Sequence, residues 1–270
     1  MTSPRWRYAY GSVKGTSHER DGKPCQDHSA CALLTDGAGR DVLVAVASDG
    51  AGSAACSEAG SALVCAMFVE AIRSFLSEEG EIGGLSDDFF RAWIGQVQEA
   101  LRLMADAAGV AVREYACTFL AAVVGEEHAA FAQIGDGAIV VGSTEEPDTY
   151  SWEFWPQQGE YENTTYFITE SKAADKLQIS LRAGGGGDEV ALFSDGLQRL
   201  ALHYQSQSAH SPFFRPFFAA LREETELPCS DKYTRSLIAF LNSRQVNERT
   251  DDDKTLIVAT RRPAARTALS

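Results

Sequence analysis

Aspartates that border apolar runs are the residues of this chain with the clearest potential for chemistry. Asp49, Asp136 and Asp195 each follow an apolar run directly or after one residue, and each is followed by glycine. The order reverses near the end of the sequence, where residues 251–253 (Asp-Asp-Asp) precede an apolar run. The same side chain therefore recurs where buried strands are expected to begin or end.

An aspartate at the end of a central strand is held in place by its sheet, and a following glycine lets the backbone turn sharply. Carboxylate and carbonyl oxygens are the ligands that Mg²⁺ and Mn²⁺ prefer. Carboxylates brought together from distant strands repel one another unless a cation lies between them. The pattern therefore predicts a binuclear site for divalent cations.

Each aspartate motif also has a simpler interpretation when it is taken alone. Asp-Gly after a strand is more often a hairpin turn than a ligand, and the pair at 136–137 lies between two apolar runs as a hairpin would. The run at 251–253 alone is typical of a solvated charge cluster. Only the combination, in this order and with these flanks, favours a metal site.

The elements that must position these aspartates are visible as hydrophobic periodicity. Apolar runs predict strands, and spacings near 3.6 residues predict four helices, with Ser230 as the N-cap of the last one. The expected strands are 42–47, 118–124, 129–134, 138–141, 165–169, 189–193 and 255–259, and the expected helices are 59–76, 89–104, 213–224 and 230–244. Such segregated runs favour an α+β fold over an alternating α/β sheet. Residues 144–159 are expected to be an irregular surface excursion, and the chain 1–270 is expected to form one domain.

Composition limits the possible partners. The chain has 270 residues and a formal net charge of −14, which disfavours binding to nucleic acid or to an anionic membrane. We see no signal peptide and no apolar stretch near the roughly 20 residues of a membrane span. The six cysteines form no Cys-x-x-Cys pair. A cytoplasmic protein with free thiols is the expectation, and the sequence carries no signal for an oligomeric state.

Five motifs in a fixed order resemble the PPM/PP2C family of metal-dependent serine/threonine phosphatases, in its divergent bacterial branch. They lie at residues 22–27 (Gly-Lys-Pro-Cys-Gln-Asp), 47–52 (Ala-Ser-Asp-Gly-Ala-Gly), 134–137 (Ile-Gly-Asp-Gly), 193–196 (Phe-Ser-Asp-Gly) and 252–255 (Asp-Asp-Lys-Thr). The resemblance covers residues 10 to 260 approximately. It implies a four-layer α-β-β-α sandwich with two central antiparallel sheets and a metal cleft at one end.

The resemblance also implies roles for single residues. Asp49 would bridge two Mn²⁺ or Mg²⁺ ions, and the Gly50 carbonyl would ligate one of them. Asp195 and Asp252 would hold the second ion, while Asp27 would support the first through ordered water. The catalytic set is then Asp49, Asp195 and Asp252, and a water activated by the cations would attack phosphorus directly, without a phosphoenzyme.

Other positions match the family less closely. Asp136 matches a position associated with a third, weaker metal. The family commonly has an arginine before its first acidic motif to bind phosphate, and this chain has none there. His18 or Lys23 could substitute. His18 is equally well interpreted as a loop histidine without a role. Gln26 replaces the usual glutamate, and Ala51 replaces the usual histidine.

The resemblance implies a phosphoprotein substrate, with a serine/threonine kinase or its targets as the partner. A catalytically weak scaffold that binds metal or phosphoprotein is the alternative, since fold does not determine function. Another phosphatase chemistry is suggested by Cys229 and Arg235, which match Cys-x5-Arg. That chemistry needs a tight loop of backbone amides that lowers the thiol pKa. This segment contains no glycine and is typical of a helix start, so we interpret the match as chance.

Overall fold

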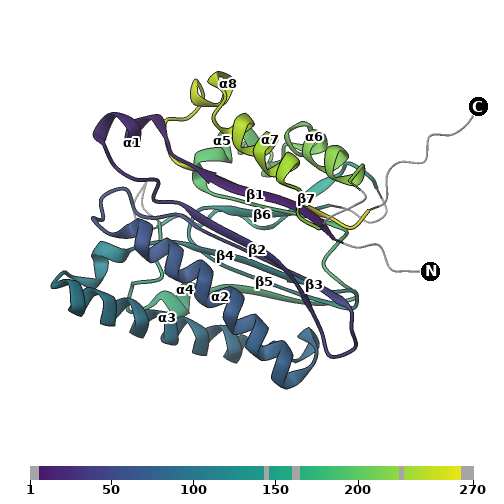
Figure 1. Ribbon diagram of the computed structural model, residues 1–270, viewed down its shortest axis with the longest axis horizontal. Helices are drawn as coiled ribbons and strands as arrows, with labels where there is room; N and C mark the ends of the chain where they lie inside the picture. Colours follow the sequence, from purple (N-terminus) through teal and green to yellow (C-terminus); the bar gives the residue numbers. More distant parts are fainter. Residues whose placement is uncertain (1–5, 143–145, 160–164, 225–227, 263–270) are drawn as a thin grey trace, which may run out of the picture.

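Two five-stranded antiparallel sheets form the centre of the molecule (Figure 1). The structure is a computed structural model that describes residues 6–142, 146–159, 165–224 and 228–262. The first sheet has the spatial order β1 (Arg7–Val13), β12 (Lys254–Thr260), β9 (Glu189–Phe193), β6 (Ala138–Gly142) and β7 (Tyr150–Phe154). The second has the order β2 (His28–Thr35), β3 (Asp41–Ser48), β4 (Phe119–Val124), β5 (His128–Ile134) and β8 (Gln178–Ala183).

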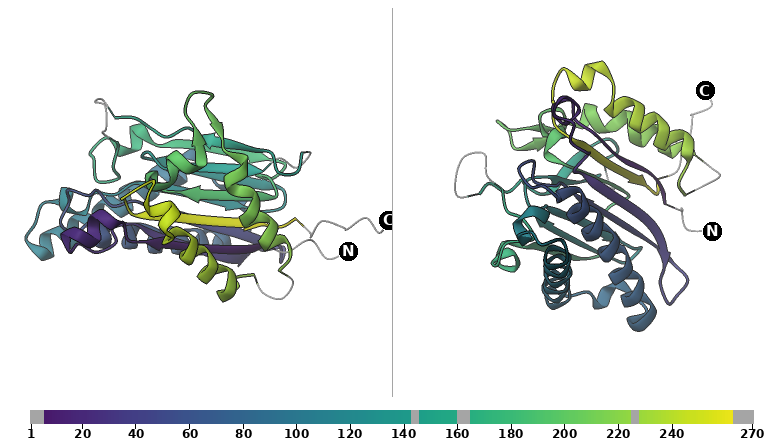
Figure 2. Two further views of the ribbon diagram at one scale, coloured as in Figure 1. Left: turned by 90° about the horizontal axis from the view of Figure 1, so that it is seen from above. Right: turned by 60° about the vertical axis from the view of Figure 1, so that its left-hand side comes forward.

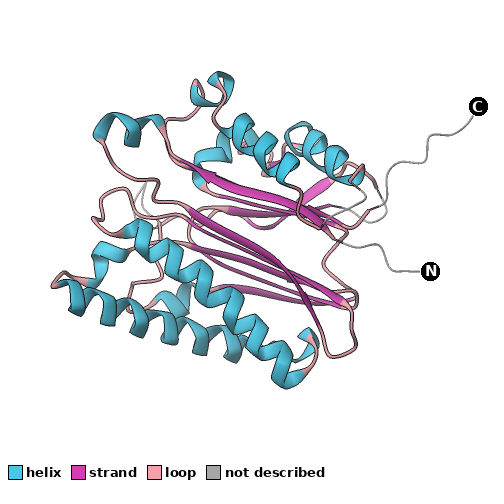
Figure 3. Ribbon diagram, viewed as in Figure 1, coloured by secondary structure: helices cyan, strands magenta, loops and turns pink. Residues whose placement is uncertain are grey.

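Helices cover the outer face of each sheet (Figures 2 and 3). The second sheet is covered by α2 (Ser57–Glu79) and α3 (Asp87–Ala108), and the first by α6 (Ser211–Arg222) and α7 (Asp231–Leu241). The expected four-layer α-β-β-α sandwich is therefore confirmed. The shorter elements are α1 (Thr16–Asp21), η1 (Ile82–Gly84), η2 (Val112–Tyr115), α4 (Ala173–Lys176), η3 (Asp195–Leu197), α5 (Gln198–Ala201), β10 (Leu202–His203), β11 (Ser208–Ala209) and α8 (Arg244–Asn247).

The central strands are apolar on both faces because each face meets another layer. In β3, Val44 and Val46 pack under α2, whereas Leu43 and Ala45 face the other sheet. Side chains also alternate along β4, β9 and β12: every second one packs under the helices, and those between them pack between the two sheets. Burial on both sides explains why these strands appear as continuous apolar runs in the sequence.

The structure departs from the expected strands at the sheet edges. All six central strands were predicted, but the four edge strands β1, β2, β7 and β8 were not. The described part of the expected excursion at 144–159 contains β7, so that prediction was wrong, while positions 144 and 145 lie outside the described residues.

The strand expected at 165–169 was also wrong, because this segment is a loop. Ile168 is buried, and its backbone N–H donates to the Cys117 carbonyl at 2.9 Å. Its own carbonyl accepts from Gln98 Nε2 at 2.9 Å. An apolar segment can be buried without joining a sheet when side chains and loops satisfy its backbone.

The long helices begin and end at residues with known capping roles. The Ser86 hydroxyl accepts a hydrogen bond from Phe89 N at 3.3 Å at the start of α3, and Gly109 ends that helix in the left-handed region (φ 67°). Ser230 occupies the N-cap position of α7 as expected, although its side chain makes no capping hydrogen bond.

Residues Ser57–Glu78 of α2 are long and apolar enough to cross a membrane, judged by length and composition alone. We expected no such segment from the sequence. In the structure, Val64, Phe68 and Ile72 of this helix are completely buried against the second sheet. The apolar character of α2 is therefore explained by its place in a core.

Candidate metal centre

The aspartates lie in loops at one end of the sandwich, the end that carries α1 (Figure 1). In the first sheet, Val13 at the end of β1 pairs with Lys254 at the start of β12. In the second sheet, His28 at the start of β2 pairs with Ser48 at the end of β3. The loops bearing Asp27, Asp49 and Asp252 therefore leave strands at the same end of the two sheets.

None of the three Asp-Gly pairs in the motifs, 49–50, 136–137 and 195–196, is a hairpin turn. Asp136-Gly137 connects β5 of the second sheet to β6 of the first, so the hairpin interpretation of this pair was wrong. Asp195 begins the short helix η3 after β9. Gly50 forms an isolated bridge with Cys117 before α2 begins. Each pair thus marks a sharp exit from a sheet.

The backbone of Asp49 is fixed by Thr118, the residue before β4. Thr118 Oγ1 accepts from Asp49 N at 2.9 Å, and Thr118 N donates to the Asp49 carbonyl at 2.8 Å. A Cβ added at Gly50 would lie 2.6 Å from the Gln26 carbonyl oxygen, so glycine is required for this close approach. The Asp49 loop and the Asp27 loop therefore pack directly together.

Asp27 is tied to two other motifs through one of its oxygens. Its Oδ2 accepts from Ser194 Oγ at 2.7 Å and from Thr255 Oγ1 at 2.8 Å. Ser194 Oγ also accepts from Thr255 N at 2.9 Å. These bonds hold the segments before β2, after β9 and at the start of β12 in one arrangement and leave Asp27 Oδ1 free.

Asp253 holds the N-terminal loops around the site. It is buried, and its carboxylate accepts from the backbone N–H groups of Gly15 and Gln26, both at 2.6 Å. His18 Nδ1 lies 2.9 Å from Asp253 Oδ2. Of the three consecutive aspartates, Asp251 is exposed and pairs with Arg20. The interpretation of this run as a solvated cluster therefore fits Asp251 but not Asp253.

The carboxyls of the site repel one another in the absence of a cation. Burial, opposed by hydrogen bonds from Ser194 and Thr255, leaves the pKa of Asp27 raised to about 7. Burial and the charge of Asp195 raise the pKa of Asp136 to about 7 and that of Asp252 to about 6. Burial and the charges of Asp27 and Asp195 raise the pKa of Asp49 well above its usual range.

This arrangement fits a divalent cation. Asp27 Oδ1 and Asp195 Oδ1 are buried and make no hydrogen bond within the described residues. In that same part of the chain, no lysine or arginine forms an ion pair with Asp27, Asp49, Asp136, Asp195 or Asp252. Buried carboxylates without a counter-charge are unfavourable. Hard oxygen ligands in this number are the donor set that Mg²⁺ and Mn²⁺ prefer.

The two candidate phosphate-binding residues flank the loop that follows Asp49. Lys23 Nζ is exposed and donates to the Gly52 carbonyl at 2.7 Å. His18 is buried, and its Nε2 would lie 4.0 Å from a Cβ added at Gly52. Because a carboxylate only accepts, the bond to Asp253 assigns the proton to His18 Nδ1 and turns Nε2 toward this loop.

Gln26, which stands where the family usually has glutamate, has a role within the loops. Its Nε2 donates to the Ala54 carbonyl at 3.0 Å, and its own carbonyl accepts from Ser61 Oγ at 2.6 Å. Gln26 Oε1 is buried and without a hydrogen-bond partner among the described residues. The side-chain amide of Gln26 therefore joins the Asp27 loop to the segment before α2, and its backbone carbonyl joins the same loop to α2 itself.

Cys229 lies far from the aspartates. It forms an isolated bridge with Tyr8 at the start of β1, whereas the aspartates lie beyond the end of that strand at Val13. At roughly 3.3 Å per residue, these points are about 17 Å apart. Burial raises the pKa of the Cys229 thiol, and α7 begins two residues later. A thiolate nucleophile would need the opposite shift, and all six cysteines are free thiols as expected.

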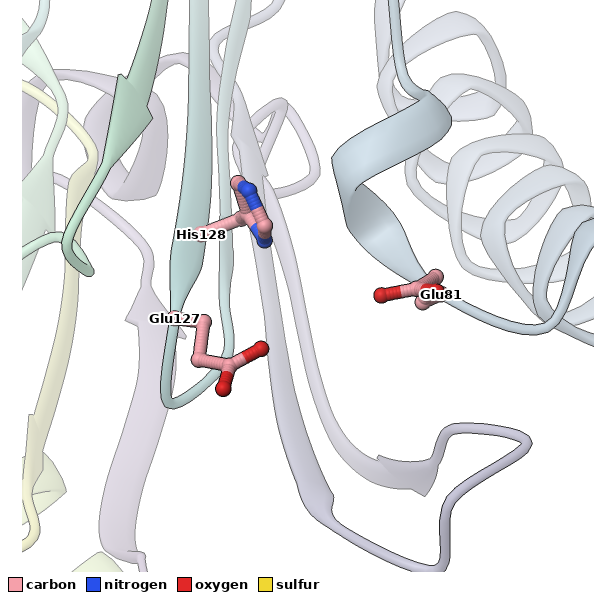
Figure 4. Close-up of side chains that lie close together, drawn as sticks. All are labelled: Glu81, Glu127 and His128. Carbon is pink, nitrogen blue, oxygen red and sulfur yellow. The ribbon is translucent and has the colours of Figure 1, made fainter.

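A second group of possible metal ligands lies at the opposite end of β5 (Figure 4). Its members are Glu81, Glu127 and His128. Arg40 already neutralises the two carboxylates: its Nη1 lies 2.7 Å from Glu127, and its Nη2 lies 3.7 Å from Glu81. We interpret this group as a surface ion-pair network that links three turns.

Sequence reasoning missed the residues that hold the aspartates in place. Ser194 and Thr255 bond Asp27, and Asp253 bonds the loops on either side of α1. Ser194 directly precedes Asp195, and Thr255 is the last residue of the motif at 252–255, so their membership of the motifs was the available signal. The run at 251–253 contained Asp253, but no periodicity at a loop indicates which of three carboxylates turns inward.

Comparison with known proteins agrees with this arrangement. Residues 14–242 match the family model described as protein phosphatase 2C. Asp252 and Asp253 lie beyond the matched range, so their placement rests on the geometry described above. Serine/threonine-protein phosphatase 3 of Escherichia coli (strain K12) is 37% identical over 259 residues, which cover 94% of this chain and 98% of that protein.

Solved structures share the fold at lower identity. The serine/threonine phosphatase Stp1 from Staphylococcus aureus has a TM-score of 0.58 at 16% identity, covering 96% of each chain. The catalytic domain of the serine threonine protein phosphatase PstP, solved in complex with two manganese ions, has a TM-score of 0.57 at 16% identity, covering 94% of this chain and 97% of that one. From the matched family model and the relative from Escherichia coli, we conclude that this chain belongs to the protein phosphatase 2C family.

Proposed function

We propose that this protein is a metal-dependent phosphatase that hydrolyses phosphoserine and phosphothreonine in proteins, with residues 1–270 acting as one catalytic domain. The main support is the convergence of the buried Asp27 with the half-buried Asp49 and Asp136, whose carboxyls repel one another and form no ion pair with lysine or arginine in the described structure. The related phosphatase from Escherichia coli and the two-manganese structure of PstP support it.

Five residues would hold two Mn²⁺ or Mg²⁺ ions: Asp27, Asp49, Gly50 (through its carbonyl), Asp195 and Asp252. Asp136 would contribute to a third, weaker site. When bound, the cations would activate a water for direct attack on phosphorus and neutralise charge on the phosphoryl oxygens.

The side chains around this set orient it. Ser194 and Thr255 occupy Asp27 Oδ2 and so direct its free Oδ1 into the site. Asp253 fixes the loops of Gly15 and Gln26 and holds His18 Nδ1. Such outer partners commonly determine how well ligands are positioned.

His18 and Lys23 are the proposed phosphate-binding residues. The Lys23 ammonium uses one of its three donors on Gly52 and keeps the others for an anion. His18 presents Nε2 toward the same loop and so lies beside the position proposed for the phosphate.

The proposed substrate is a phosphoprotein in the cytoplasm, phosphorylated by a serine/threonine kinase whose effect this enzyme would reverse. The free thiols are consistent with such a location.

Two variants separate the proposed chemistry from its competitors. With Mn²⁺ and a phosphothreonine peptide, we expect Asp195→Asn to lower kcat/KM by more than about 100-fold, beyond the loss typical of outer-shell partners. The control Cys229→Ser should retain turnover. Loss of activity in Cys229→Ser alone would identify a cysteine mechanism. Absence of turnover in a wild-type protein that still binds Mn²⁺ would identify a catalytically inactive scaffold.

A further inference from the structure

Three aromatic side chains, Trp152, Trp155 and Tyr204, form a continuous strip on the surface. The ring centroids of Trp152 and Trp155 lie 5.7 Å apart, and those of Trp155 and Tyr204 lie 5.4 Å apart. Both pairs meet edge to face, at 68° and 75°. Trp152 is 37% exposed and Tyr204 is 45% exposed, unlike the fully buried Trp6 and Trp93.

One end of the aromatic strip reaches the metal centre. The Tyr204 hydroxyl donates to Gln198 Oε1, and Gln198 Nε2 donates to the Asp136 carbonyl. A second connection runs through Gln133, whose Nε2 donates to the Trp155 carbonyl at 3.4 Å and to the Gly135 carbonyl at 3.2 Å. The strip therefore starts at the turn that carries Asp136.

The aromatic strip is held in a fixed shape. Trp152 lies on β7 and donates through Nε1 to the Gln207 carbonyl at 2.7 Å. Gln207 and Tyr204 belong to the hairpin formed by β10 and β11, in which Leu202 pairs with Ala209. Trp155 packs partly against the core of the first sheet, whereas Trp152 and Tyr204 stay exposed and are held beside the site by these hydrogen bonds.

The electrostatic surroundings of the aromatic strip are negative. Burial first, and then the charges of Asp136 and Asp195, raise the pKa of Tyr204, while Arg199 acts in the opposite direction. Asp136, the four ligand aspartates and the dianionic substrate phosphate together carry more negative charge than two or three divalent cations would cancel. The formal net charge of the whole chain is −14. Aromatic faces in a negative electrostatic potential favour a cationic ligand.

We propose that the aromatic strip binds a lysine or arginine side chain of the substrate, located a few residues from the phosphorylated serine or threonine. An extended peptide advances about 3.3–3.6 Å per residue, so a phosphorylated residue at the metal centre places its neighbours along the strip. This inference rests on the proposed phosphatase function and assigns the strip a role in substrate selection.

Paired phosphothreonine peptides test the proposal without any mutation. Each pair carries lysine or its uncharged isostere norleucine at one position, from three residues before to three residues after the phosphothreonine. We expect lysine to raise kcat/KM by about 3- to 10-fold at one or two positions, chiefly through KM. Equal values at all positions, or a preference for norleucine, would overturn the proposal.

Two variants then locate the effect. Trp152→Leu and Tyr204→Leu keep apolar bulk but remove the aromatic face, and each should reduce the lysine preference to about 2-fold or less. The control Leu103→Ala removes an exposed apolar side chain from the outer surface of α3 and should keep the preference. A preference that persists in both strip variants would contradict the proposal.

A small substrate keeps the two proposals separable. Hydrolysis of p-nitrophenyl phosphate, which has no flanking residues, reports on the metal centre alone. If the wild type hydrolyses it without distinguishing the paired peptides, the inference about the aromatic strip fails and the proposed function stands. If the wild type hydrolyses no phosphoester, the proposed function itself fails.

Discussion

At the level of single residues, Asp253 is the aspartate whose side chain holds the loops around the centre together. Its carboxylate accepts from two backbone N–H groups and from His18, so it connects the loops on both sides of α1. The neighbouring Asp251 is exposed and forms only a surface ion pair with Arg20. The two residues carry the same side chain and differ in burial and bonding, which makes them a matched pair.

We predict that Asp253→Asn lowers the free energy of unfolding by about 1–3 kcal/mol, because an amide replaces a charged acceptor of buried donors. Asp251→Asn should change it by no more than about 0.5 kcal/mol. Urea unfolding of the two variants in EDTA measures this difference without any contribution from metal. Equal destabilisation by the two substitutions would contradict the assigned role of Asp253.

Asp195 should have the opposite effect on the stability of the metal-free protein. Its charge contributes to the raised pKa values of Asp49, Asp136 and Asp252. Asp195→Asn removes that repulsion, so we predict a higher unfolding midpoint in EDTA together with a smaller gain on addition of Mn²⁺. Thermal unfolding with and without Mn²⁺ tests both. A variant that is less stable in EDTA yet keeps the full Mn²⁺ gain would show that Asp195 is not a ligand.

At the element scale, the junction of η3 with the start of β12 is the tightest contact between motifs. A Cβ added at Gly196 would overlap the carbonyl oxygen of Asp253, whereas one added at Gly95 in the exposed middle of α3 would meet nothing within 4 Å. Substitution by alanine adds the same methyl group at both positions, so the two variants differ only in what that group meets.

We predict that Gly196→Ala destabilises the protein by about 1–3 kcal/mol or more, through overpacking at the centre. Gly95→Ala should stabilise it by up to about 1 kcal/mol, through helix propensity. Chemical denaturation with and without Mn²⁺ gives both values. A neutral Gly196→Ala variant with normal Mn²⁺ binding would contradict the close packing of the two loops.

The elements also show what the sequence could predict. Strands buried on both faces, such as β3 and β9, are continuous apolar runs, and all six central strands were found. The edge strands were missed because one side is exposed or polar, as in β8, where Leu181 is exposed and the charged Arg182 is half-buried. Patterning detects burial, so it detects central strands and also a buried loop such as 165–169, which is not a strand.

The candidate centre was predictable to the level of its aspartates, but not of the bonds between them. Asp49, Asp136 and Asp195 were identifiable because each one ends an apolar strand. The inward position of Asp253 depends on how a loop closes onto Gly15 and Gln26, more than 200 residues away in sequence. Such long-range contacts leave no local periodicity.

At the scale of the whole molecule, the fold places repelling carboxyls where two sheets meet at one end. Their pKa values lie above the usual 3.8, at about 7 for Asp27 and Asp136 and about 6 for Asp252. These groups therefore bind protons more tightly in the folded state than in the unfolded state. Stability that depends on such protonation is lost as pH rises toward the folded pKa.

We predict that the metal-free protein becomes less stable as pH rises from about 5 to about 8, while the gain from Mn²⁺ increases over the same range. Deprotonation creates the ligands that a cation requires, so the two trends share one cause. Urea midpoints at several pH values, with EDTA or with Mn²⁺, measure both. A gain from Mn²⁺ that is larger at pH 5 than at pH 8 would contradict this linkage.

In the proposed function, a pair of cations held by these aspartates would activate the water that attacks phosphorus. The most direct measurement follows turnover of a phosphothreonine peptide and bound Mn²⁺ on the same metal-depleted sample as Mn²⁺ is added. We predict no turnover without metal and activity that saturates as two ions bind per chain. Turnover that persists in fully metal-depleted protein would contradict a metal-dependent reaction.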